Sequence, residues 1–197
     1  MNSNFIAVIG HRNLSQPIEE KVRKALKYKL SELKSENVKV LTGLALGVDQ
    51  IAAEICLELS IPYEVVLPMP EDEFFNKSIA QDLDTKQQKK AKNKFEILLS
   101  KAEAIHQIYE EEWFKDAIKN SISASKPYEL LGDYLCDISQ QCIFVWDGVQ
   151  NGKPGGTSDT LAKAMQKKDL IKWELKLFNE ISGQTDQSEF YKWEKFL

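Results

Sequence analysis

Short apolar runs alternate with longer segments of helical spacing along most of the chain. Four runs are strand-sized and rich in β-branched and aromatic residues: 5–9, 38–41, 63–67 and 141–146. Runs of this kind are typical of strands buried on both faces of a parallel sheet. Apolar residues recur at helical spacing between them, first at Val22, Leu26, Leu30 and Leu33. This β-α-β-α-β order predicts an α/β fold with three α/β/α layers and a mostly parallel sheet.

The helices that follow the strands have recognisable starts and ends. Ser15 and Pro17 mark the first helix, and the second runs from Gly47 to the break at Ser60–Pro62. Further helices are predicted over 128–138 and 157–167, and a last strand over 169–175. The middle of the chain is less regular. We expect a loop or short helix at 71–75, and a helix that packs on the core through Phe95, Leu98 and Leu99. A short strand is predicted at 104–109 and an acidic loop or insertion at 110–126.

One domain is expected over residues 1–175, with an insertion at about 71–127. Residues 176–197 are predicted to form a C-terminal helix or arm. This segment carries four aromatic residues close to its end: Phe190, Tyr191, Trp193 and Phe196. Because such side chains need burial against the domain or against a second copy, we expect a homo-oligomer.

Glycine-containing loops follow three of the predicted strands. Gly10 ends the first strand, Gly43 and Gly47 follow the second, and Gly148, Gly155 and Gly156 follow the fourth. A loop of this kind before a helix directs backbone N–H groups at one spot, which suits a phosphate or another anion. The carboxyl ends of parallel strands meet at one edge of a sheet. The loops therefore predict a pocket for a nucleotide-like ligand, the alternative being that each glycine only permits a tight turn.

Several side chains in these loops could contact such a ligand. Arg12 could bind a phosphate or carboxylate, and His11 could donate to the ligand, act as an acid or base, or only hold the loop. Asp49 either complements the helix dipole or holds the loop or a ligand hydroxyl. Asp147 could accept a ribose hydroxyl or fix the loop. For Trp146, internal packing is favoured over base stacking. The candidate ligand-binding residues are Gly10, His11, Arg12, Thr42, Gly43, Leu44, Ala45, Gly47, Asp49, Pro68, Trp146, Asp147, Gly148, Gly155, Gly156, Thr157 and Thr160.

Composition narrows the class of protein. With 26 basic and 30 acidic residues the net charge is −4, so nucleic acid is not drawn in by an overall positive field. The lysines over 86–94 form either a local basic groove or a solvated helix face. No apolar run reaches the roughly 20 residues of a membrane span. Residues 1–4 lack the basic stretch and the long apolar segment of a signal peptide, so we expect none. Three cysteines in apolar settings predict buried free thiols and a cytoplasmic protein.

The sequence lacks the motifs of metal sites and of several common enzyme classes. The two histidines and three cysteines show no spacing typical of a metal site, and we expect neither a metal nor a cofactor. The loops match neither a Walker loop, nor a G-x-G-x-x-G fingerprint, nor a G-x-S-x-G elbow. ATP hydrolysis and hydride transfer therefore lose support.

Five segments together resemble the SLOG superfamily over roughly residues 4–170. They are Ile9–Arg12, Thr42–Glu54, Val66–Pro68, Trp146–Gly148 and Gly155–Thr157. That superfamily includes Lonely Guy-type phosphoribohydrolases, the Rossmann domain of DNA-processing protein A and bacterial nucleotide-sensor domains. The resemblance implies a Rossmann-like fold that binds or senses a nucleotide or nucleotide-derived ligand, with no membrane involved.

The chain departs from the hydrolase members at one position. Their P-G-G-x-G-T-x-x-E pattern ends on a glutamate, whereas Thr160 stands three residues after Thr157 here. A hydroxyl cannot replace that carboxylate, so a binding domain is favoured over an enzyme and no catalytic residue is assigned. Three alternatives stay open: a hydrolase in which Glu71, Asp147 or Asp159 supplies the carboxylate, a single-stranded DNA-binding protein, and an assembly module.

Overall fold

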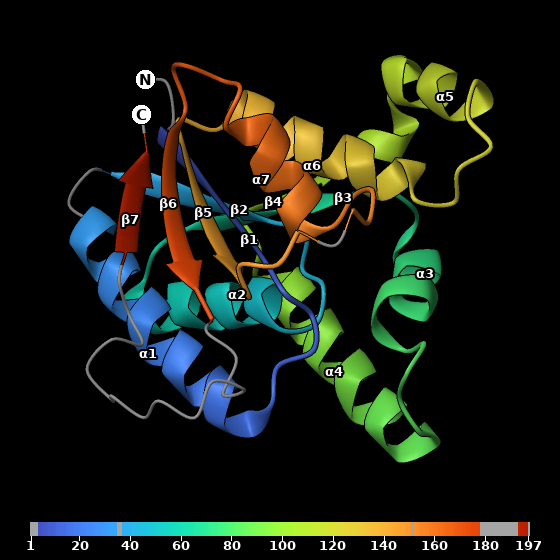
Figure 1. Ribbon diagram of the computed structural model, residues 1–197. Helices are drawn as coiled ribbons and strands as arrows, with labels where there is room; N and C mark the ends of the chain where they lie inside the picture. Colours follow the sequence, from blue (N-terminus) through green and yellow to red (C-terminus); the bar gives the residue numbers. More distant parts are fainter. Residues whose placement is uncertain (1–3, 35–36, 151, 178–192, 197) are drawn as a thin grey trace.

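The computed structural model describes residues 4–34, 37–150, 152–177 and 193–196, and within them one sheet dominates (Figure 1). Its strands stand in the order β4-β3-β2-β1-β5-β6-β7. The strands are β1 (Asn4–Gly10), β2 (Val38–Thr42), β3 (Tyr63–Leu67), β4 (Ala104–Gln107), β5 (Gln141–Trp146), β6 (Ile171–Lys176) and β7 (Trp193–Phe196). Every neighbouring pair is parallel except β6 and β7, which are antiparallel. The fold is therefore Rossmann-like α/β, as the sequence predicts.

Helices cover both faces of the sheet. On one face lie α1 (Gln16–Leu33), α2 (Val48–Leu59) and α4 (Thr85–Lys101), and on the other lie α6 (Lys126–Ile138) and α7 (Thr157–Ala164) (Figure 1). Alternation along β1 explains the two layers, because successive side chains of a strand point to opposite faces. Ile6 and Val8 belong to the core under α1 and α2, whereas Ala7 belongs to the core under α6 and α7.

The strongest apolar runs become strands at the predicted places. The predicted strands 63–67 and 141–146 coincide with β3 and β5. β1 is one residue longer at each end than the predicted 5–9, and β2 is one residue longer at its carboxyl end than the predicted 38–41. Residues of β5 are buried along its whole length, which is the environment a continuous apolar run requires. The three cysteines, Cys56, Cys136 and Cys142, are buried and free.

The middle of the chain is more ordered than the sequence indicates. Residues 110–126, expected to be a loop, contain helix α5 (Glu112–Lys119), of which only Phe114 is buried. The segment after β3 forms α3 (Glu71–Phe74) and continues as a π-helical turn, η2 (Phe75–Ile79). A short 3-10 turn, η3 (Ile108–Glu110), follows β4. Helix α4 starts at Thr85, where Asp84 and Gln87 form a capping box, although apolar residues are sparse in its first half.

Most of the segment 176–197, predicted as a C-terminal helix or arm, lies outside the described residues. Trp193–Phe196 form β7, which pairs with β6 in the register Leu175↔Trp193. Phe190 and Tyr191 lie outside the described residues, and the expected homo-oligomer stays a prediction. No helix of the described residues is long and apolar enough to cross a membrane.

The strand order places the point where the topology reverses. The chain runs outward from β1 through β2 and β3 to β4, and then returns to β5 on the other side of β1. β1 and β5 are neighbours in the sheet, but the chain leaves β1 for α1 on one face and leaves β5 for α7 on the other face. In open parallel sheets, ligands bind at this switch point, beyond the carboxyl ends of the strands.

Candidate functional site

Backbone hydrogen bonds join the loops that follow β1, β2 and β5. The N–H of His11 donates to the carbonyl of Val145 at 3.1 Å, and the N–H of Val48 donates to the carbonyl of His11 at 3.1 Å. The loop after β1 is thus fastened both to the end of β5 and to the first turn of α2. Residues far apart in the sequence come together at one edge of the sheet.

Gly47 is required by this close approach. Its φ is +82°, and a Cβ placed there would lie 2.3 Å from the carbonyl oxygen of His11. Gly10 contributes in the same way, since a Cβ would lie 2.5 Å from the side chain of Val48. These glycines allow helix α2 to sit directly against the end of β1.

The loop after β2 is held by its own side chains. The hydroxyl of Thr42 accepts from the N–H of Leu44 at 3.1 Å and donates to the carbonyl of Asp49 at 3.3 Å. Thr42 and Leu44 are fully buried, and Pro68 at the end of β3 is buried as well. These three candidate residues therefore support the carboxyl edge of the sheet from the protein interior.

Asp49 turns its carboxyl group into the same loop. One oxygen accepts from the N–H of Ala45 at 3.4 Å. Burial of the carboxyl raises the pKa of Asp49 to about 7, although the N–H groups of Ala45, Gly10 and Gly43 and the Arg12 guanidinium act to lower it. The amide groups predicted to receive a ligand anion therefore already face an acidic group of the chain itself.

His11 and Asp147 meet at the switch point, between the loops after β1 and β5. The N–H of Asp147 lies 3.0 Å from Nε2 of His11, and the Asp147 carboxylate lies 3.1 Å from the same nitrogen. The two side chains are 25% and 31% exposed, so a ligand could reach both. Burial acts to raise the pKa of Asp147, but the N–H of Val149 and the His11 imidazole outweigh it and lower that pKa. The Asp147 carboxylate could accept a hydrogen bond from a ligand hydroxyl.

Trp146 packs inside. It is 6% exposed, and its indole N–H donates to the carboxylate of Glu174 at 2.6 Å. Gly148 follows Asp147 with a φ of +79°, and a Cβ added there would lie 4.0 Å from the side chain of Lys176. Glu174 is a partner that the sequence did not indicate, because it lies on β6, 28 residues away.

The glycine loop before α7 is also closed by internal hydrogen bonds. The N–H of Gly155 donates to the carboxylate of Asp159 at 3.0 Å, and the Thr160 hydroxyl donates to the carbonyl of Gly156 at 3.1 Å. Gly156 caps α7 and Thr157 is its first residue. Thr160 is buried against Gly132 of α6, so it faces the protein interior.

Arg12 links the loop after β1 to two other segments. Its guanidinium donates to the carbonyl of Ser78 in η2, and the Ser78 hydroxyl lies 2.8 Å from the hydroxyl of Tyr128 at the start of α6. Tyr128 in turn packs on Gly155, because a Cβ added to Gly155 would lie 2.8 Å from the Cβ of Tyr128. Nε of Arg12 is buried and has no partner among the described residues.

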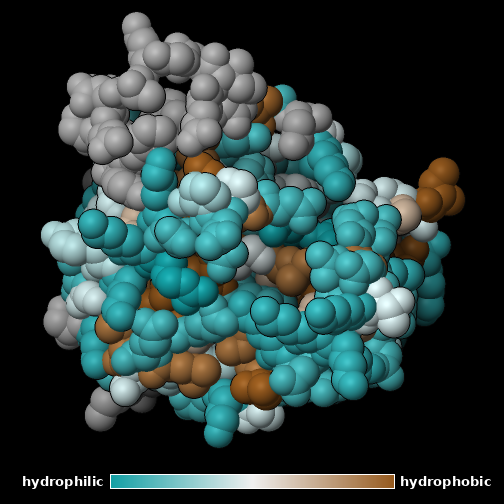
Figure 2. Space-filling model, turned by 90° about the horizontal axis from the view of Figure 1, so that it is seen from below, coloured by the Kyte–Doolittle hydropathy of each residue, from teal (hydrophilic) through white to brown (hydrophobic). Residues whose placement is uncertain are grey.

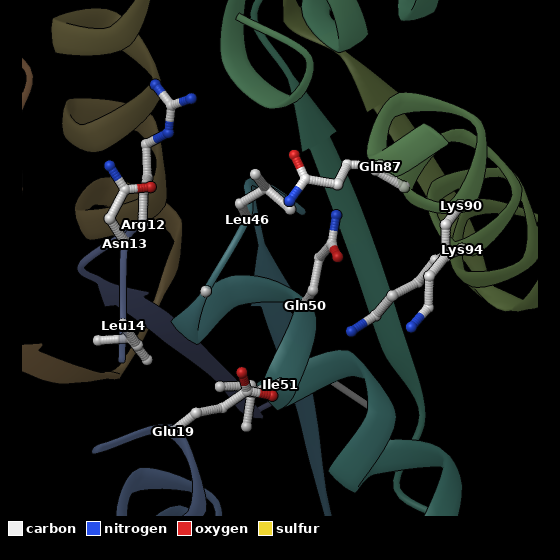
Figure 3. A pocket seen from close by; sticks show the side chains of 12 residues that line it. Arg12, Asn13, Leu14, Glu19, Leu46, Gln50, Ile51, Gln87, Lys90 and Lys94 are labelled. Carbon is white, nitrogen blue, oxygen red and sulfur yellow. The ribbon is translucent and has the colours of Figure 1, made fainter. Parts of the chain in front are cut away.

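A pocket of about 370 Å³ opens beside Arg12 (Figure 3). We call it the α2–α4 pocket. One side is formed by Arg12, Asn13, Leu14 and Glu19; the base by Leu46, Gly47, Gln50 and Ile51; and the far side by Gln87, Lys90, Ala91 and Lys94. Of the candidate ligand-binding residues, only Arg12 and Gly47 line it. Sequence reasoning noticed the α4 lysines, but could not place them opposite α2.

The surface seen in Figure 2 is mostly hydrophilic, with hydrophobic residues in small separate groups. A face of this kind is unlike the large apolar patch of a stable protein interface.

Comparisons with known proteins agree with this architecture. Residues 1–115, more than half of the chain, match the family model of DNA recombination-mediator protein A. DNA processing protein A from Streptococcus pneumoniae has a similar structure, with a TM-score of 0.52 and 15% identity over 83% of this chain and 47% of that chain. The molybdenum cofactor binding protein from Rippkaea orientalis has a TM-score of 0.52 and 14% identity over 88% of this chain and 78% of that chain.

Identities of 15% and 14% show that these two proteins share a fold with this chain. This chain spans less than half the length of the Streptococcus pneumoniae protein. No curated protein matches the sequence.

Proposed function

The chain belongs to the DNA recombination-mediator protein A family, and we propose that it binds a nucleotide or nucleotide-derived ligand at the carboxyl edge of its sheet. The α2–α4 pocket beside Arg12 carries this proposal. Its volume of about 370 Å³ falls within the range of small-molecule sites. Three basic side chains and one acidic side chain line it, which favours an anionic ligand.

The chemistry of the lining suits a phosphorylated nucleoside. Arg12 uses one N–H for the Ser78 carbonyl, and a guanidinium has five such donors, so others remain for a ligand oxygen. The carboxamide of Asn13 offers donors and an acceptor to a ribose or base, and Gln87 keeps its amide N–H groups for a ligand while its Oε1 accepts from the N–H of Asp84. The apolar side chains of Leu14, Leu46 and Ile51 supply the surface against which a base could pack.

A thermal-shift series tests the proposal. The purified chain is titrated with AMP, ADP-ribose, NAD and a cyclic dinucleotide, and adenosine serves as the uncharged control. A ligand at a hundred times its Kd stabilises a folded protein by about 2.7 kcal/mol through mass action. We expect at least one of the four anionic compounds to raise the melting temperature well above the effect of adenosine. No shift with any of them at millimolar concentration would contradict nucleotide binding.

A second candidate is the binding of single-stranded nucleic acid. The family is one observation in its favour, and three exposed lysines of α4, Lys86, Lys89 and Lys90, are the other. None of these three has an ion pair with a described residue. An oligonucleotide binding assay at 50 and 200 mM salt separates the two candidates, since each phosphate contact to a single strand adds about −0.7 to the logarithmic salt slope. Neutralising Lys86 and Lys89 should weaken the binding of an oligonucleotide, but not that of a mononucleotide in the pocket.

Hydrolysis of an N-glycosidic bond has less support. In the loop before α7, the Thr160 hydroxyl is bonded to Gly156 and the Asp159 carboxylate is bonded to the N–H of Gly155. Neither side chain is placed to assist bond cleavage while it holds the loop. Incubation with AMP and chromatography for free adenine provides the direct check, and we expect no adenine above the level of a protein-free control.

A further inference from the structure

One face of α4 turns four residues towards α2. Gln87, Lys90, Ala91 and Lys94 follow the i, i+3, i+4, i+7 spacing of a single helix face, and all four line the α2–α4 pocket. Ala91 is the small residue among them and is 9% exposed. Figure 3 shows the side chains of Lys90 and Lys94 extending from α4 towards Gln50 of α2. The two ammonium groups thus point into the pocket from the same side.

The two lysines differ in their partners. Nζ of Lys94 lies 2.7 Å from a carboxylate oxygen of Glu54, and Arg23 binds the other oxygen of Glu54. Lys90 has no ion pair with any residue that the structure describes. Glu19 is the acidic residue in the pocket lining, and its carboxylate lies 3.6 Å from a guanidinium nitrogen of Arg23. The positive charge of Lys90 is therefore not compensated by the groups around it.

We infer that Lys90 and Lys94 form a subsite for a phosphate group, or for another compact anion of similar charge. This inference rests on the proposed function and names the part of the pocket that receives the charged end of the ligand. Lysine ammonium groups bind phosphate as mobile point charges with three donors each. When Lys94 turns to the ligand, Glu54 keeps Arg23 as its partner, so the carboxylate is not left alone. Arg12 stands on the opposite side of the pocket, where it can take a second anionic group.

Substitution of neighbouring lysines provides the test. Lys90→Ala removes an ammonium group that lines the pocket, and Lys89→Ala removes one from the adjacent position, which does not line it. Both residues are exposed, so neither change should unfold the protein. We expect Lys90→Ala to weaken AMP binding about tenfold, the value of one charge-assisted hydrogen bond, and Lys89→Ala to leave it unchanged. Binding of adenosine, however weak, should be the same in both variants and in the wild type.

Inorganic pyrophosphate serves as a probe that does not depend on a nucleotide. It should raise the melting temperature of the wild type and of Lys89→Ala more than that of Lys90→Ala. If AMP binds equally to the wild type and Lys90→Ala, the subsite is wrong while the proposed function stands. If no nucleotide binds but pyrophosphate stabilises in a Lys90-dependent manner, the anion subsite stands and the proposed function fails. Equal responses of all three proteins to pyrophosphate, with no nucleotide bound, would overturn both.

Discussion

The carboxylate of Asp49 accepts a hydrogen bond from the backbone N–H of Ala45, 3.4 Å away, inside the loop that leads into its own helix. The N–H groups of Gly10 and Gly43 act on the same carboxyl. Three of the backbone donors at the edge of the sheet are thus directed at an acid of the chain. A ligand anion would meet positively charged side chains farther out, at Arg12, Lys90 and Lys94.

The protonation of Asp49 should affect stability in a defined pH window. Its pKa is about 7 in the folded protein and ordinarily 3.8. Between those values the folded state holds more protons than the unfolded chain, so the contribution of Asp49 to the free energy of unfolding falls as the pH rises from about 4 to 7. Each unit of difference between the folded and unfolded pKa of Asp49 corresponds to about 1.4 kcal/mol in the free energy of unfolding.

Asp49→Asn removes this dependence. We expect the free energy of unfolding of the variant, minus that of the wild type, to increase from pH 4.5 to pH 7 and to level off above it. Urea denaturation at four pH values measures the difference, and Asp82→Asn, at an exposed position, is the control. A difference that does not change with pH would show that Asp49 is ionised throughout.

Gly47 should tolerate no side chain. Gly47→Ala would place a Cβ 2.3 Å from a backbone oxygen at a φ of +82°. We expect a loss of more than about 2 kcal/mol in the free energy of unfolding. Gly152→Ala is the matched control, because Gly152 has a φ of +64° but no atom within 4 Å of the added Cβ. Its cost should be about 1 kcal/mol, and equal losses in the two variants would mean that backbone strain alone matters.

Trp146 should contribute to stability rather than to ligand binding. Trp146→Phe removes the donor to Glu174, which is 3% exposed. We expect a loss of about 1–3 kcal/mol, because the buried carboxylate then lacks its closest partner. Trp113→Phe, at a residue that is 44% exposed, should cost much less. A Trp146→Phe variant of normal stability but with weaker nucleotide binding would instead assign the ring to base stacking.

Gly132 and Thr160 form a close contact between α6 and α7. A Cβ on Gly132 would lie 2.6 Å from the Thr160 hydroxyl oxygen. Gly132→Ala should therefore destabilise the protein, although alanine alone favours a helix by about 1 kcal/mol over glycine. The double variant Gly132→Ala/Thr160→Ala should be more stable than the sum of the single changes predicts, by about 1 kcal/mol or more in a double-mutant cycle. Additive changes would mean that the two helices can separate without cost.

Much of the fold follows from local pattern. β1 and β5 contain the continuous apolar runs Phe5–Ile9 and Cys142–Trp146, and runs of that length between helical segments are typical of buried parallel strands. Helix α5 carries apolar residues at helical spacing, Trp113, Phe114, Ala117 and Ile118, but the acidic residues around them favoured the prediction of a loop. The first half of α4 was missed because Gln and Lys dominate it, so an apolar face is not visible there.

The sequence by itself determined the strand–loop–helix units and the glycines that end them, because backbone conformation and burial on both faces are local requirements. Only the tertiary structure decided which groups meet. His11 and Asp147 are 136 residues apart, and Lys90 faces Gln50 across two different helices. The order of the strands brings such residues together, and that order depends on how all the helices pack on the sheet at once. The same packing directs Thr42, Asp49 and Thr160 inward to hold the loops, while Arg12 and the lysines of α4 are left to line the pocket.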